Sequence, residues 1–165
     1  MRKLAYITLS LLLFTTTIFA AEPPTQEMLV QHSVVKMRLS PAITIEDATE
    51  AMLSKAVELN LALVGRQQMS AALGRRGIDS SHIEIFQFCN PEDAVKMVRY
   101  DIIYAAYMPC RIALVEDESG SPWLTTLNLN MMIEKDRLPD EIYRIAVTTN
   151  TKMMAIMTAG ANGDF

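Results

Sequence analysis

The chain has 165 residues, of which 50% are hydrophobic and 21% are charged, and its formal net charge is −4. This composition excludes a disordered or fibrous protein, because such chains lack the apolar residues that a packed core needs. The length suits one domain with an ordinary core. The acidic balance makes nucleic acid and anionic membrane surfaces poor partners.

The first twenty residues have the pattern of a secretory signal peptide. Arg2 and Lys3 precede an uncharged run over residues 4–19, and small residues follow at Ala20 and Ala21. We expect cleavage after Ala20, and therefore an exported, periplasmic protein with no later membrane span. An uncleaved anchor is the alternative, although the run is shorter than the ~20 residues that span a bilayer. Cleavage leaves thirteen basic and nineteen acidic residues, a net charge of about −6.

Apolar runs and alternating apolar positions predict five strands. The expected strands are residues 32–39, 61–65, 83–89, 102–115 and 122–129. The fourth run contains Pro109, which donates no ladder hydrogen bond and therefore marks an edge, a bulge or a bend. Residues 116–121 form the hairpin turn between the last two strands.

Apolar residues at helical spacing predict four helices. The expected helices are residues 45–59, 68–73, 91–100 and a last one that starts at Pro139. Thr44 and Asn90 are the N-caps of the first and third, and acidic residues follow each cap. One apolar stripe runs along the last helix: Ile142, Ile145, Ala146, Met153, Ile156 and Met157. We expect fraying from Gly160 onward.

This order of elements predicts one α+β domain, a sheet with helices on one face. We place the domain at residues 31–160, after a lead-in at 21–30 and before a tail at 161–165.

Four motifs in the predicted elements are similar to a known family of bacterial and archaeal proteins. They are Thr44-Ile-Glu-Asp-Ala48, Phe88-Cys-Asn-Pro91, Met108-Pro-Cys110 and Val115-Glu-Asp-Glu-Ser-Gly120. On these residues the chain resembles the domain-of-unknown-function 302 family (DUF302). The resemblance implies a β-α-β(4)-α order with extra helices, in which a curved antiparallel sheet resembles half of a TATA-binding-protein-like fold. It also implies a homodimer, but neither DNA binding nor an agreed activity.

Both cysteines lie where a run of strand-like residues meets a proline, Cys89 in Cys-Asn-Pro and Cys110 in Met-Pro-Cys. Three alternatives stay open for the pair. A disulfide suits an oxidising compartment and would add about 3 kcal/mol of stability. Two free buried thiols are the second alternative, and reactive thiols or a metal site are the third. The backbone N–H groups of the helix after Cys89 would lower the pKa of its thiol, whereas Glu92 and Asp93 would oppose that effect.

Eleven methionines remain after cleavage, and thioethers together with thiolates would suit Cu(I). Met153 and Met157 lie four residues apart on the apolar stripe, so we interpret them as core residues. Met108 and Cys110 alternate and could share a strand face, with Pro109 between them. The two histidines are isolated, and zinc would need more ligands at closer spacing. We therefore predict no metal site, and the cofactor stays unknown: the sequence implies none, and copper is the one metal that these sulfur ligands would suit.

The motifs predict a site but not a reaction. The candidate site residues are Cys89, Asn90, Pro91, Met108, Pro109 and Cys110. We favour a non-enzymatic binding or accessory module, which works as a dimer and takes a small ligand or a periplasmic protein in a shallow pocket. The alternative is a thiol-redox or sulfur- or metal-handling protein in which Cys89 and Cys110 carry the chemistry.

Overall fold

A computed structural model describes residues 28–30, 33–133 and 137–165, so the expected signal peptide lies outside the described residues. These residues form an antiparallel sheet in the order β1-β2-β6-β5-β4-β3. The strands are β1 Met28–Val30, β2 Val34–Arg38, β3 Ala62–Gln68, β4 Ile83–Cys89, β5 Cys110–Glu116 and β6 Pro122–Leu127. Five of them make the sheet proper, and the short β1 extends one edge. Every second residue of β4 is buried, as expected for a strand with one covered face.

Four α-helices and two 3₁₀ helices connect or cover these strands. They are α1 Ile45–Glu58, α2 Met69–Gly74, α3 Pro91–Tyr100, η1 Ile102–Tyr107, η2 Leu129–Met132 and α4 Asp140–Asn162. Helix α1 begins after Thr44, whose side chain accepts a hydrogen bond from the Asp47 backbone N–H. The Asp47 carboxylate in turn accepts a hydrogen bond from the Thr44 backbone N–H. This capping box satisfies two N–H groups that the helix itself leaves unpaired. No helix in the described part of the chain is long and apolar enough to cross a membrane.

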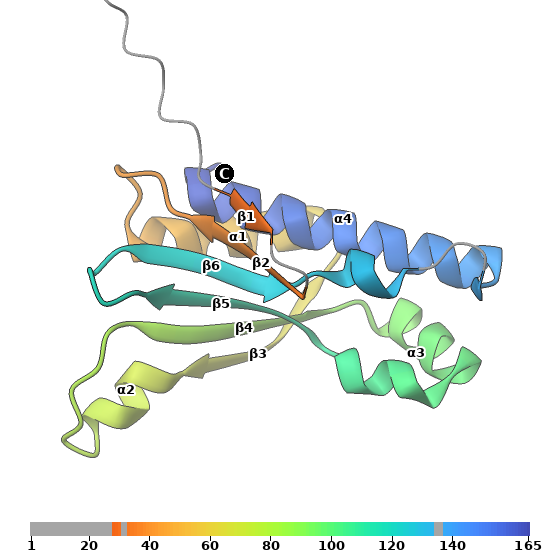
Figure 1. Cartoon of the computed structure of the whole chain (residues 1–165), viewed down its shortest axis with the longest axis horizontal. Coiled ribbons are helices and arrows are strands. Elements are labelled where there is room, and N and C mark those ends of the chain that lie inside the picture. Colours follow the sequence, from red (N-terminus) through yellow and green to blue (C-terminus); the bar gives the residue numbers. More distant parts are fainter. Residues whose placement is uncertain (1–27, 31–32, 134–136) are drawn as a thin grey trace, which may run out of the picture.

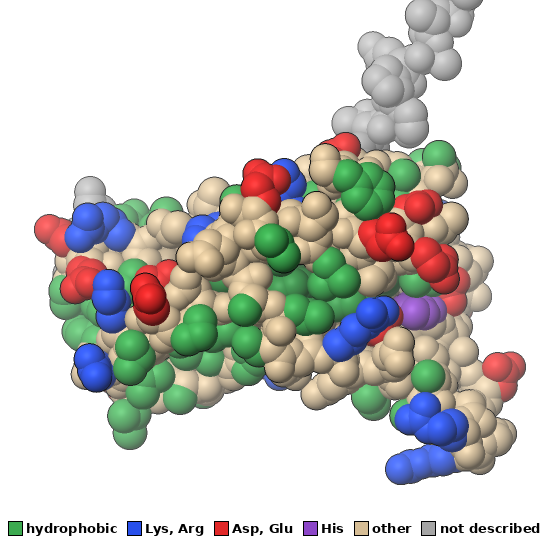
Figure 2. All heavy atoms as spheres, turned by 180° about the vertical axis from the view of Figure 1, so that it is seen from behind, with side chains coloured by type: hydrophobic (Ala, Val, Ile, Leu, Met, Phe, Trp, Pro, Cys, Tyr) green, Lys and Arg blue, Asp and Glu red, His purple; other side chains and the backbone are tan. Residues whose placement is uncertain are grey.

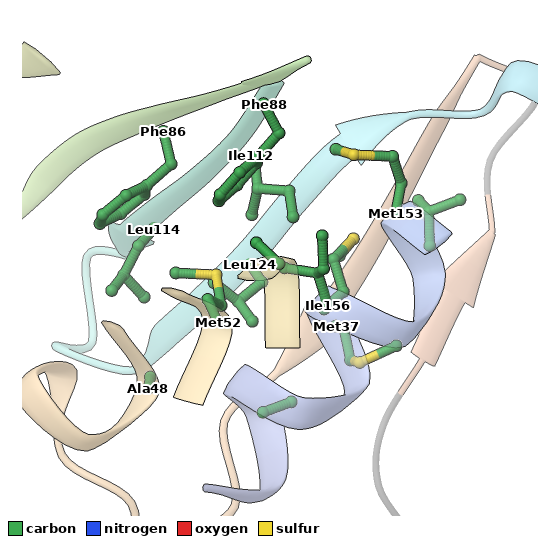
Figure 3. Close-up of a cluster of buried hydrophobic side chains, with 14 of the residues drawn as sticks. Met37, Ala48, Met52, Phe86, Phe88, Ile112, Leu114, Leu124, Met153 and Ile156 are labelled. Atoms are coloured by element: carbon green, nitrogen blue, oxygen red, sulfur yellow. The ribbon is translucent and has the colours of Figure 1, made fainter. Parts of the chain in front are cut away.

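Helices α1 and α4 pack against each other and cover one face of the sheet (Figure 1). The core lies in this layer, where side chains of β4, β5 and β6 meet those of the two helices (Figure 3). Phe86, Ile112 and Leu124 from the sheet are fully buried there, as are Met52 and Ile156 from the helices. The expected α+β class is confirmed, and α2 and α3 connect strands at opposite ends of the lower strands in Figure 1.

The apolar run at residues 102–115 is not one strand, so this prediction is wrong in its first half. Residues Ile102–Tyr107 form η1, which begins where the Asp101 side chain accepts a hydrogen bond from the Ile103 N–H at 2.9 Å. Pro109 precedes β5 rather than interrupting it. Since β5 pairs with both β4 and β6, a proline inside it would have removed a ladder hydrogen bond.

The expected fraying from Gly160 onward is also wrong for the end of α4. The helix continues to Asn162, and Ala161, which we placed in the tail, is fully buried. The Ala161 carbonyl accepts a hydrogen bond from the Ser40 N–H at 2.8 Å. Gly163, with φ of +70°, ends the helix in the left-handed conformation that glycine adopts readily. Tertiary packing therefore holds a segment that local propensity would have let fray.

Candidate functional site

The Cys-Asn-Pro motif joins the end of β4 to the start of α3. Cys89 is the last strand residue, and Asn90 caps the helix by accepting hydrogen bonds from the N–H groups of Glu92 at 3.0 Å and Asp93 at 3.1 Å. Pro91 occupies the first helical position, where no N–H is needed. These roles agree with the predicted cap. They hold Cys89 in a fixed place beside the N-terminus of α3.

The Met-Pro-Cys motif joins η1 to β5. The peptide bond between Met108 and Pro109 is cis, and Cys110 is the first residue of β5. Cys110 lies directly opposite Phe88 in the ladder, one residue before Cys89. The two motifs, about twenty residues apart in the chain, therefore meet at the same end of neighbouring strands.

A small cavity of about 50 Å³, the cysteine cavity, lies where the two motifs meet. Its lining residues are Leu61, Phe88, Cys89, Asn90, Asp93, Ala94, Met97, Met108, Cys110, Ile145 and Thr149. Four of the six predicted site residues are thus brought together. The other two, Pro91 and Pro109, shape the backbone but are not among the lining residues.

A second cavity of about 80 Å³, the tyrosine cavity, adjoins the first. The two share Met97, Met108, Cys110, Ile145 and Thr149. The residues that line only the tyrosine cavity are Tyr104, Tyr107, Leu129, Ile133 and Ala146. Side chains from α3, η1, η2 and α4 therefore build one mostly apolar recess at the end of the sheet. Such a recess can hold a small apolar group.

Both cysteines are free thiols, and no disulfide joins them. Burial raises the pKa of the Cys110 thiol to about 11, and repulsion from Cys89 adds to the shift. The pKa of Cys89 is also raised, first by burial and then by the negative charge of Asp93. At Cys89, burial and Asp93 therefore raise the pKa by more than the N-terminus of α3 lowers it. Both groups are neutral thiols near pH 7, a poor state for a nucleophile.

A polar cluster lies at the opposite end of β4. Glu84 is 2% exposed and accepts two hydrogen bonds from Arg66 in β3, at 2.6 and 3.2 Å. The Nε2 atom of His82 lies 3.6 Å from Glu84, and neither it nor the Ser80 hydroxyl has a hydrogen-bond partner among the residues that the structure describes. This bidentate ion pair with Arg66 neutralises the charge of the buried Glu84 carboxylate.

Several cavity residues were not predicted from the sequence. Met97 and Ile145 belong to apolar helix faces that the sequence shows, but nothing in their spacing indicates that they line a recess. Tyr104 and Tyr107 lie in the segment expected to be a strand. Three-residue spacing of the two tyrosines was the one available signal, because it places both on one side of a 3₁₀ helix.

The comparisons with known proteins concern the fold that carries this recess. The sequence model of the family described as "Domain of unknown function DUF302" matches residues 36–160. The chain belongs to the DUF302 family. The crystal structure of an uncharacterized conserved DUF302 protein from Bacillus stearothermophilus is similar, with a TM-score of 0.63 and 14% sequence identity. The similarity covers 76% of this chain and 96% of the Bacillus chain. A search of curated proteins found no match.

At 14% identity, the Bacillus structure shows a shared fold and nothing about activity. The family description names no reaction either. The function of this DUF302 domain must therefore be argued from its own site. Within the described residues, no three histidine, cysteine, aspartate or glutamate side chains are grouped so that they could hold a metal ion.

Proposed function

We propose that this DUF302 protein is an exported, non-enzymatic binding or accessory module, whose ligand site is the recess formed by the cysteine and tyrosine cavities. The observation that carries the proposal is the recess itself, because elements distant in sequence converge to leave apolar space instead of filling it. Well-packed cores have few voids larger than a water molecule. The combined size favours a small apolar ligand or the apolar end of a larger one.

Two further features support a partner protein or a second copy of the chain beside this recess. Ile102 and Ile103 of η1 are 79% and 57% exposed, on the same short helix that contributes the two cavity tyrosines. Hydrophobic side chains also gather between the middle and the lower left of the surface seen from behind (Figure 2). Exposed apolar groups of this kind mark interaction surfaces more often than scattered ones do.

Export is supported by the pattern of residues 1–20, and a periplasmic location follows if the segment is cleaved after Ala20. Sequencing the N-terminus of the secreted protein tests this step, and the expected first residue is Ala21. A retained N-terminus in the membrane fraction would instead support the anchor.

Xenon is a suitable probe of the recess, because it enters apolar cavities without needing hydrogen bonds. Under xenon pressure, methyl NMR signals of Leu129 and Ile133, which line only the tyrosine cavity, are expected to shift and saturate, whereas that of the core residue Ile156 stays in place. Ala146→Leu should abolish the shifts by filling the tyrosine cavity. Val147→Leu is the matched control, since Val147 is 36% exposed on the same helix. Equal shifts in wild type and Ala146→Leu would contradict the proposal.

The alternative, thiol-redox chemistry, has one observation in its favour: both free thiols line one cavity. Burial acts against it, because buried neutral thiols react slowly. We expect iodoacetamide to label the native protein far more slowly than the urea-unfolded protein, as mass spectrometry would show. Rapid iodoacetamide labelling of either cysteine in the native protein would favour the redox function instead.

A further inference from the structure

Four sulfur-bearing side chains line the cysteine cavity. They are Cys89 at the end of β4, Met97 in α3, Met108 before the cis peptide bond and Cys110 at the start of β5. The other buried methionines behave differently. Met37, Met52, Met153 and Met157 belong to the main core and line neither cavity. Two methionines and both free cysteines thus line the same cavity, at the end of neighbouring strands.

The size and lining of the cavity restrict what it can hold. At about 50 Å³ it has room for an ion or one or two water molecules. Water needs two to four polar partners to be held in a cavity, and the wall here is mostly apolar side chains and sulfur. Asp93 and Asn90 are the strongly polar lining residues, and the Asn90 oxygen is already engaged in capping α3. Sulfur is therefore the dominant ligand chemistry available.

We propose that these four side chains form a binding site for Cu(I). Thiolate and thioether ligands select a soft, monovalent cation, whereas structural zinc takes four cysteine or histidine ligands and carboxylates suit harder ions. Each bond that forms between copper and a cysteine sulfur releases the proton of that thiol to solvent. Copper stays Cu(I) throughout, so no electron acceptor or donor is required.

Both thiols are neutral without a metal ion, so copper must displace a proton from each, and nearby positive charge offsets part of that cost. The N-terminus of the ten-residue helix α3 follows Cys89 after one residue, and the helix dipole stabilises negative charge there. Arg111 follows Cys110 directly and favours its ionised form. Asp93 acts in the opposite direction at Cys89. The site does not depend on an apolar ligand in the tyrosine cavity, so either proposal can fail without the other.

Anaerobic competition with the Cu(I) chelator bicinchoninate tests the site on the secreted protein. We expect wild type to remove one equivalent of Cu(I) from the chelator, and X-ray absorption to show only sulfur in the first coordination shell. Cys110→Ser should weaken binding by at least about tenfold. The double variant Met97→Leu/Met108→Leu should also bind more weakly, because it keeps the volume of both side chains but removes both thioethers.

Met153→Leu is the matched control, since it removes a buried thioether from the core outside the cavity. Its affinity for Cu(I) should equal that of wild type. Circular dichroism identifies any variant that fails to fold. If Cys110→Ser does not fold, the isosteric methionine variants still test the site. The proposal is overturned if wild type leaves all Cu(I) with the chelator, if zinc binds in preference, or if the double methionine variant binds as tightly as wild type.

Discussion

Asp117 organises the β5–β6 turn through one side chain. Its carboxylate accepts hydrogen bonds from the Ser119 N–H and hydroxyl at 2.9 and 2.6 Å, from the Ser121 N–H at 3.0 Å, and from Trp123 Nε1 at 2.8 Å. These hydrogen bonds hold the pKa of Asp117 well below its ordinary value. The side-chain bonds from Ser119 and Trp123 contribute most, and the backbone bonds contribute less. The acidic stretch that reads as a solvated turn in the sequence is therefore also a hydrogen-bonded unit that fixes the one tryptophan.

This lowered pKa predicts an acid-dependent contribution to stability. Because the folded-state pKa lies below the unfolded value of about 3.9, the contribution is fully present above that value and is lost as pH falls through the folded-state pKa. We expect the stability difference between wild type and Asp117→Asn to be constant above about pH 5 and to shrink below about pH 4. Urea unfolding followed by Trp123 fluorescence measures it.

Glu118→Gln is the control for this prediction, since it changes a neighbouring acid in the same exposed turn. If the stability difference between wild type and Asp117→Asn is the same at pH 6 and pH 3, the negative charge of the carboxylate does not stabilise the turn.

At the scale of elements, the contact between α1 and α4 depends on Gly160. A Cβ atom added there would lie 2.5 Å from Met52 Cγ, 3.1 Å from Leu124 Cδ1 and 3.2 Å from the Ala48 carbonyl oxygen. Glycine thus lets the end of α4 approach α1 and β6 closely. The same residue that predicts a frayed helix end by local propensity is the one that permits tertiary packing to hold that end.

We expect Gly160→Ala to destabilise the protein by about 1–3 kcal/mol, because the new methyl group must push the packed core apart. Urea unfolding of the variant measures the loss. Gly74→Ala is the control: nothing lies within 4 Å of a Cβ atom at Gly74, so this change should be neutral or stabilising by up to about 1 kcal/mol. A Gly160→Ala protein as stable as wild type would show that the helices can separate without cost.

For the whole molecule, a homodimer remains our prediction. Sedimentation velocity on the purified protein, at micromolar concentration, should give twice the mass of the chain. Loss of the dimer in Ile102→Asp/Ile103→Asp would place η1 in the interface, and these exposed side chains should cost little folding stability when replaced. A monomer at every concentration would contradict the prediction.

Much of the fold could be predicted from local sequence. Strand β4, helix α3 and the two caps at Thr44 and Asn90 agree with the structure, because alternation and capping are interactions between residues close in the chain. The run at residues 102–115 was misjudged for the converse reason. An apolar run of that length is consistent with strand or helix, and only the hydrogen bond to Asp101 and the pairing of β5 separate the two.

The sequence by itself determined the order of strands β2 to β6 and of the four α-helices, the acidic composition and the proline near each cysteine, since all of these depend on residues close in the chain. Only the tertiary structure decided that Cys89 and Cys110 are free thiols in one cavity, and that Met97 and Ile145 complete its wall. The physical reason is that a cavity is space left between elements. Its shape depends on how β4, α3, β5 and α4 pack together, and no spacing along the chain encodes that arrangement.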